Sequence, residues 1–167
     1  VSIGVMVRGR IEHGVIYDPL RDELFTASRG AGAQLNDRRL RVTKQKTLAG
    51  SLISTGFPFK YHEHFPAYLA TFNAVFPEVS DLRRGGSAAL DLAYVAAGRV
   101  DAYWELGLQK WDLAAGVLLI EEAGGVVSDF TGGENHIEHG NLVAGNFNIH
   151  QQLLNQIKPH LSEALKK

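Results

Sequence analysis

The chain has 167 residues, of which 45% are hydrophobic and 21% charged, and its formal net charge is −1. This composition is typical of a single folded domain, and a net charge near zero provides no electrostatic case for nucleic acid or a membrane surface. Because the chain has no cysteine, disulfides, thiolate metal sites and a cysteine nucleophile are excluded. No charged leader and no membrane-length apolar run occurs, so we expect a cytoplasmic protein.

The first forty residues are predicted to form an antiparallel meander. Apolar residues at alternate positions have the period of a β-strand: Val1, Ile3, Val5 and Val7. Further short strands are expected over residues 11–17, 23–27 and 28–36, separated by turns. The chain opens at Val1 within a strand pattern. We therefore expect residues 1–45 to be the end of a first sheet whose N-terminal part is missing.

Residues 46–167 are predicted to form a second half in which strands and helices alternate. Strands are expected at 51–56, 81–84, 100–106, 126–130 and 141–144. Helices are expected at 65–76, with an aromatic stripe as its buried face, and at 88–97, 112–123 and 149–165. A meander followed by this alternation indicates an α/β fold built from layers of sheet and helix.

Asp112 begins the predicted helix at 112–123 and directly follows Trp111. In its ordinary structural role, a carboxylate at a helix start caps free N–H groups and lies at the positive end of the helix dipole. A rigidly held carboxylate is also a good ligand for a hard cation. The residue alone does not decide between these roles.

Two other stretches could contribute to a binding or catalytic site. Gly85 and Gly86 let a ligand approach the backbone just before Ser87, where N–H groups at a helix start can donate to oxygens. Alternatively, Ser87 is only the N-cap of that helix. Glu105 lies at the end of an apolar strand, so its carboxylate needs a partner, either a salt bridge or a polyol hydroxyl.

The common hydrolase and nucleotide motifs are missing: there is no Gly-x-Ser-x-Gly elbow, no P-loop and no His-Glu-x-x-His. His136 and His139 lie three residues apart in a predicted loop without further ligand types nearby. We interpret both histidines as surface residues.

Taken together, four stretches resemble the inositol monophosphatase family, and in particular its bacterial extragenic suppressor branch. They are residues 86–101 (GSAALDLAYVAAGRVD), Glu105, and Trp111-Asp112-Leu113-Ala114-Ala115-Gly116 followed by Glu122-Ala123-Gly124-Gly125. The resemblance extends over essentially all 167 residues but corresponds to only the C-terminal three-fifths or so of such a protein.

The resemblance implies a layered α-β-α-β-α fold and a Mg²⁺-dependent phosphomonoesterase that hydrolyses inositol monophosphate. In the family, the aspartate of the Trp-Asp motif ligates a metal and contacts substrate, which assigns the catalytic and metal-binding role to Asp112. Substrate hydroxyls are contacted by the Gly-Ser-Ala turn, here Gly86, Ser87 and Ala88, and by the preceding glutamate, here Glu105. Family members are usually homodimers.

The family's Glu-Glu pair and Asp-Pro-Leu-Asp-Gly-Thr motif should lie just upstream of Val1 and are absent. A single aspartate leaves most of the coordination of Mg²⁺ to water, so we expect this chain alone to bind the metal weakly and to be inactive. Two alternatives stay open. One is a phosphatase for another sugar or nucleotide phosphate. The other is a transcription-associated interaction module with secondary phosphatase activity, which would be favoured by a basic patch of Arg38, Arg39, Arg41, Arg83 and Arg84.

Overall fold

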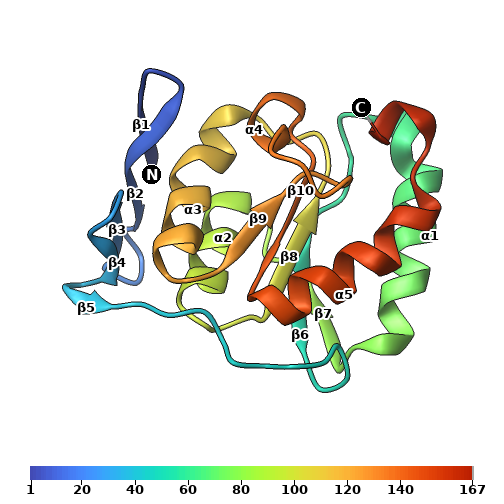
Figure 1. Ribbon diagram of the computed structural model, residues 1–167, viewed down its shortest axis with the longest axis horizontal. Helices are drawn as coiled ribbons and strands as arrows, with labels where there is room; N and C mark the ends of the chain where they lie inside the picture. The colour runs from blue at the N-terminus through green and yellow to red at the C-terminus, as the bar shows by residue number, and fades with distance from the viewer. Residues whose placement is uncertain (167) are drawn as a thin grey trace.

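The computed structural model describes residues 1–166 and contains two sheets with helices between and beside them (Figure 1). The first sheet is an antiparallel meander with the strand order β1-β2-β3-β4-β5. Its strands are β1 (Ser2–Val7), β2 (Arg10–Asp18), β3 (Glu23–Ser28), β4 (Gly32–Leu35) and β5 (Arg38–Arg39). The predicted meander is therefore confirmed, with one additional short strand at its end.

The second sheet is mixed and has the order β7-β6-β8-β10-β9. Its strands are β6 (Leu52–Thr55), β7 (Asp81–Arg83), β8 (Ala102–Glu105), β9 (Val126–Ser128) and β10 (Leu142–Gly145). β6 is parallel to both β7 and β8, and Thr55 lies opposite Trp104. The carboxyl ends of β6 and β8 therefore meet at the same edge of the sheet.

The helices form two layers. α2 (Ala88–Ala96) and α3 (Lys110–Glu122) lie between the sheets, and α1 (Phe65–Val75) and α5 (Phe147–Ile157) cover the other face of the second sheet (Figure 1). A short α4 (His136–His139) precedes β10. Residues 1–166 thus supply a β-α-β-α stack, which is four layers of the expected α-β-α-β-α arrangement. No helix in this range is long and apolar enough to cross a membrane.

Small residues let α3 approach the first sheet closely. A Cβ on Gly4 would lie 2.6 Å from Ala114 Cβ, and a Cβ on Gly14 would lie 2.9 Å from the carbonyl oxygen of Ala115. On the same side of the sheet, Phe25 is fully buried. The opposite face of this sheet is less covered, because Ile3 and Val5 are 53% and 44% exposed.

Two helix boundaries differ from the prediction. α3 begins at Lys110, so Asp112 is its third residue and not its first. The predicted C-terminal helix over 149–165 stops at Ile157 and continues as separate 3₁₀ turns at Lys158–His160 and Glu163–Lys166. The interruption falls at Pro159, whose missing N–H and ring are incompatible with a helix interior.

The buried face of α1 also differs from the predicted aromatic stripe. The structure buries Tyr68 and Val75 of that stripe together with Thr71, whereas Phe65 and Phe76, at the two ends of the stripe, are 45% and 59% exposed. α1 lies at the margin of its layer with α5 as its main neighbouring helix. A helix packed on one side only buries a narrower stripe than its apolar pattern suggests.

Candidate active site

A pocket of about 250 Å³ lies where β6 and β8 end and where α2 and α3 begin. Its wall includes all five residues that the sequence predicts for the site: Gly86, Ser87, Ala88, Glu105 and Asp112. In α/β sheets, ligands bind beyond the carboxyl ends of parallel strands, which is where this pocket lies.

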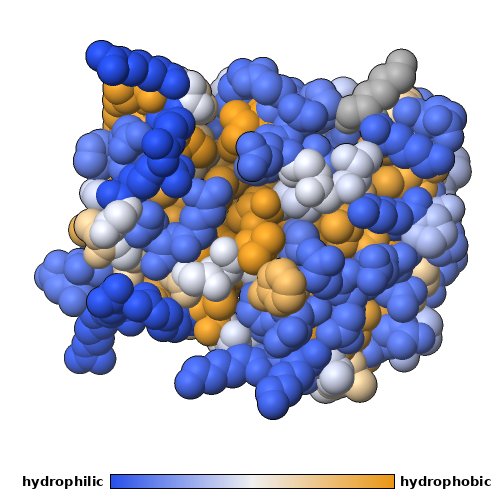
Figure 2. All heavy atoms as spheres, viewed as in Figure 1, coloured by the Kyte–Doolittle hydropathy of each residue, from blue (hydrophilic) through white to orange (hydrophobic). Residues whose placement is uncertain are grey.

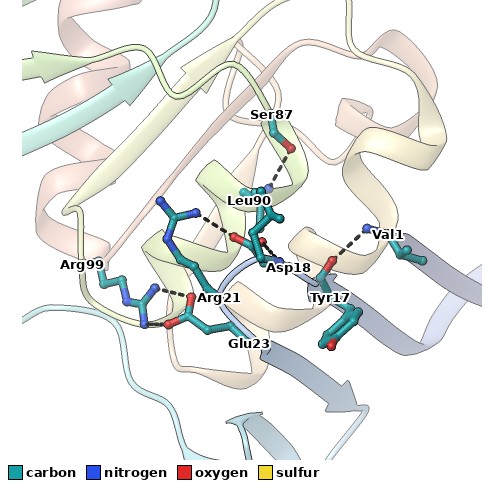
Figure 3. A network of polar contacts seen from close by, with 9 residues as sticks. Val1, Tyr17, Asp18, Arg21, Glu23, Ser87, Leu90 and Arg99 are labelled. Carbon is teal, nitrogen blue, oxygen red and sulfur yellow. Dashed lines mark hydrogen bonds and ion pairs between the residues drawn. The ribbon is translucent and has the colours of Figure 1, made fainter.

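The turn before α2 is shaped by glycine. Gly86 has φ +90°, in the left-handed region that favours glycine. Ser87 is the N-cap of α2, and its Oγ accepts a hydrogen bond from Leu90 N at 3.5 Å (Figure 3). At the other end of the helix, Arg99 donates two hydrogen bonds to Glu23 of β3 (2.8 and 2.6 Å), which ties α2 to the first sheet (Figure 3).

Asp112 also has a local structural role. Its Oδ2 accepts a hydrogen bond from Gln109 N at 3.0 Å, which satisfies one of the free donors at the start of α3. Its Oδ1 accepts no hydrogen bond from any other residue of 1–166. The side chain is only partly buried and lines the pocket. One carboxylate oxygen therefore caps the helix while the other is free to contact a ligand.

The partner of Glu105 is a hydroxyl group. Tyr103 and Glu105 lie two residues apart on β8 and face the same side, and Tyr103 Oη donates to Glu105 Oε2. No salt bridge involves Glu105 within the described range, so the salt-bridge interpretation is wrong. Burial raises the pKa of the Glu105 carboxyl to about 7, which the nearby Asp91 reinforces and the Tyr103 hydrogen bond opposes.

Comparisons with known proteins place this chain in a family. A sequence model described as "Inositol monophosphatase family" matches residues 1–165. The chain belongs to the inositol monophosphatase family. It is 54% identical over 167 residues to a protein named Nus factor SuhB from Escherichia coli K12, and it spans 62% of the length of that relative.

Solved structures of the family share the fold. The extragenic suppressor protein suhB from Bartonella henselae matches 96% of this chain with a TM-score of 0.92 and 48% identity, and this chain covers 61% of that structure. SaIMPase-II with inositol monophosphate bound is 30% identical with a TM-score of 0.84 and matches 95% of this chain, which covers 62% of it. The same enzyme has been solved with 2'AMP bound.

The residues described here do not complete a metal site of the kind this family implies. Among residues 1–166, no group of three or more His, Asp or Glu side chains is placed to hold a metal ion. Asp112 offers one free carboxylate oxygen, which fits one position in the coordination shell of Mg²⁺ but not the six oxygen ligands that this ion prefers.

Sequence reasoning missed three charged residues of the pocket: Lys60, Arg84 and Asp91. Asp91 is 6% exposed and accepts a hydrogen bond from Ser54 Oγ at 2.6 Å. Burial raises the pKa of its carboxyl to about 6. A charged residue inside the apolar run of α2 was the available signal, since a buried carboxylate needs a partner.

One histidine was also misread. His136 is 7% exposed, and its Nδ1 has no hydrogen-bond partner within the described range. Burial lowers the pKa of this imidazole. It does not line the pocket, and His139 is exposed as expected. The short α4 turns His136 inward, which the polar composition of the loop did not indicate.

Replacing Glu105 by glutamine is expected to stabilise the fold in a pH-dependent way. The raised pKa means that the fold favours the neutral acid, so the stability advantage of the neutral form is present below pH 4.5 and lost as pH rises toward 7. We expect the variant to raise the free energy of unfolding by about 1–2 kcal/mol at pH 8, allowing for partial exposure, and by little at pH 4.5. Urea melts at the two pH values measure this. The exposed Glu78→Gln is the control, and an equal gain at both pH values would contradict the prediction.

Proposed function

We propose that the full-length protein is a phosphomonoesterase that acts on inositol monophosphate or a closely related polyol phosphate. The observation that carries the proposal is the single pocket that gathers the Gly86–Ser87–Ala88 turn, Glu105 and Asp112. Membership of the family and the inositol monophosphate bound to SaIMPase-II support the same substrate class. The chain spans about three-fifths of its relatives, and we expect residues 1–167 alone to be inactive.

Each group suits a part of a polyol phosphate. The N–H groups exposed around Ser87 and Ala88 can donate to substrate oxygens, and Gly86 leaves room for close approach. The ionised Glu105 carboxylate accepts a hydrogen bond from a ring hydroxyl. Arg84 and Lys60 contribute positive charge to the same wall, which favours an anionic substrate.

We propose Mg²⁺ as the cofactor, with Asp112 supplying one of its ligands. Any further protein ligands would come from outside residues 1–166, because this range contains no complete set, and water would fill the other positions. Asp112 would then bind the metal through Oδ1, and Oδ2 would keep its hydrogen bond to Gln109 N.

The proposal is tested by replacing Glu105 with glutamine in the full-length protein and comparing two substrates. A buried group that pairs with a substrate hydroxyl discriminates most against substrates without that hydroxyl. We therefore expect kcat/KM to fall by about tenfold or more for inositol monophosphate and by much less for p-nitrophenyl phosphate. Phosphate release measured on both substrates gives the fall in kcat/KM for each, and the two falls are then compared.

Glu138→Gln is a matched control, because Glu138 is exposed and pairs with Lys110 away from this pocket. Equal losses on both substrates in Glu105→Gln would mean that Glu105 has a structural role only. A wild-type protein that releases no phosphate from either substrate in the presence of Mg²⁺ would contradict the proposed function itself.

Two alternatives to this function are supported by the names and bound ligands of relatives. A nucleotide monophosphate is a candidate substrate because SaIMPase-II has been solved with 2'AMP bound. A role with the transcription machinery is suggested by the name Nus factor SuhB of several relatives. The arginine patch expected for that role is divided, since Arg38 and Arg39 form β5 of the first sheet and Arg83 lies on β7 of the second (Figure 1).

The oligomeric state and location are proposed from the family resemblance alone. We propose a homodimer that works in the cytoplasm. Sedimentation velocity of the full-length protein tests the dimer, and a single monomeric species at micromolar concentration would contradict it.

A further inference from the structure

The net charge of −1 conceals one strongly basic segment. Six of the 17 Lys and Arg residues lie between Arg38 and Lys60, and no Asp or Glu falls in that stretch. Five of them are exposed within nine residues: Arg38, Arg39, Arg41, Lys44 and Lys46. None of these five forms a salt bridge with another residue of 1–166, whereas six other cations do. We call residues 38–46 the basic connector.

Hydrogen bonds hold the basic connector against the body of the protein. Asn146 Nδ2 donates to Thr43 Oγ1 at 3.1 Å and to the carbonyl oxygen of Gln45 at 3.0 Å. Gln152 Nε2 donates to the carbonyl oxygen of Lys46 at 2.8 Å. These bonds engage backbone and neutral groups only. Arg41 Nη1 donates to the carbonyl oxygen of Leu40 at 2.8 Å, and none of the five cations is neutralised by an acidic side chain of residues 1–166. The segment runs along the lower edge of the molecule from β5 toward β6, where hydrophilic side chains project (Figures 1 and 2).

A groove of about 600 Å³ separates the basic connector from the start of α5. Arg41, Lys44 and Lys46 line one side, and Phe147 lines the other. Phe147 is the first residue of α5 and is 64% exposed, which is high for a large apolar residue. None of the residues lining this groove lines the candidate active site.

We propose that the basic connector and Phe147 form a binding surface for single-stranded nucleic acid. Cations displayed on a fixed extended segment can follow a phosphodiester backbone, and an exposed aromatic ring beside them can stack an unpaired base. A duplex would leave Phe147 without a base face to contact, because its bases are already stacked. A membrane surface would require several large apolar side chains, and the groove offers Phe147 as its one exposed aromatic residue.

The proposal is tested by fluorescence anisotropy with the full-length protein and labelled oligouridylate and oligothymidylate of about 20 nucleotides, which cover several contact sites and distinguish RNA from DNA. The triple variant Arg41→Gln, Lys44→Gln, Lys46→Gln should weaken binding about tenfold or more at about 50 mM salt. It should also reduce the slope of log affinity against log salt by about 2, because three phosphate contacts are lost. Phe147→Ala should weaken binding about fivefold or more without changing that slope.

The matched control is the triple variant Arg8→Gln, Arg10→Gln, Lys158→Gln, which removes three exposed cations outside the basic connector. It should bind like the wild type. Equal weakening in the two triple variants would overturn the proposal, because any surface charge would then serve. Absence of oligonucleotide binding at about 50 mM salt, or binding of anionic vesicles without oligonucleotide binding, would also overturn it. Phosphatase activity should be unchanged in all these variants, so this test is independent of the proposed function.

Discussion

Replacing Asp112 by asparagine in the full-length protein is expected to lower kcat/KM for inositol monophosphate by about 10³-fold, which corresponds to about 4 kcal/mol of transition-state stabilisation. Asparagine has nearly the same shape and its oxygen can still accept the hydrogen bond from Gln109 N, but it has no negative charge. The substitution therefore separates the helix cap from the proposed metal ligand. Isothermal titration with Mg²⁺ should show a correspondingly weaker affinity.

Asp112→Ala is the companion variant, because it removes both the charge and the cap. We expect it to lose activity to a similar extent and also to lose about 1 kcal/mol of folding stability, which asparagine should retain. If the asparagine variant keeps turnover within tenfold of the wild type and unaltered Mg²⁺ affinity, Asp112 is only a structural residue and the assignment of the metal ligand is wrong.

Replacing Gly116 by leucine is expected to lower the free energy of unfolding by about 3 kcal/mol or more and the melting temperature by about 6–12 °C. Gly116 lies where α3 crosses α2, and a Cβ there would lie 2.5 Å from Leu92 Cβ. This contact sets the spacing of two helices whose first turns carry Ser87 and Asp112. Leucine is intrinsically a better helix former than glycine, so any loss of stability reports the steric conflict.

The control for Gly116→Leu is Glu121→Leu, which introduces the same side chain on the exposed side of the same helix and removes only a partly exposed ion pair with Arg29 at 3.2 Å. This control should change the free energy of unfolding by no more than about 0.5 kcal/mol. Thermal melts followed by circular dichroism compare the two variants. An unchanged or higher melting temperature for Gly116→Leu would show that α2 and α3 can move apart without cost.

Local patterns in the sequence were sufficient for the features that depend on neighbouring residues. Alternating apolar residues predicted the strands of the first sheet, because the side-chain period of a strand is two. Gly86 followed by Ser87 predicted the start of α2, because an N-cap needs only a polar side chain and an extended backbone. The Trp111–Asp112 motif, together with Glu105 and residues 86–88, indicated the family and named five residues that the structure brings to one pocket.

Only the tertiary structure decided which groups meet across long sequence separations. Ser54 and Asp91 are 37 residues apart, and their hydrogen bond exists because β6 ends beside the first turn of α2. The high pKa of Glu105 also depends on burial by surrounding elements, whereas its hydrogen bond with Tyr103 is a local contact along β8. The composition of a loop likewise does not indicate which of its side chains will be buried, as that of His136 is. Local sequence determines strand period and helix caps through short-range sterics and hydrogen bonds, whereas burial and charge environment follow from how separate elements pack.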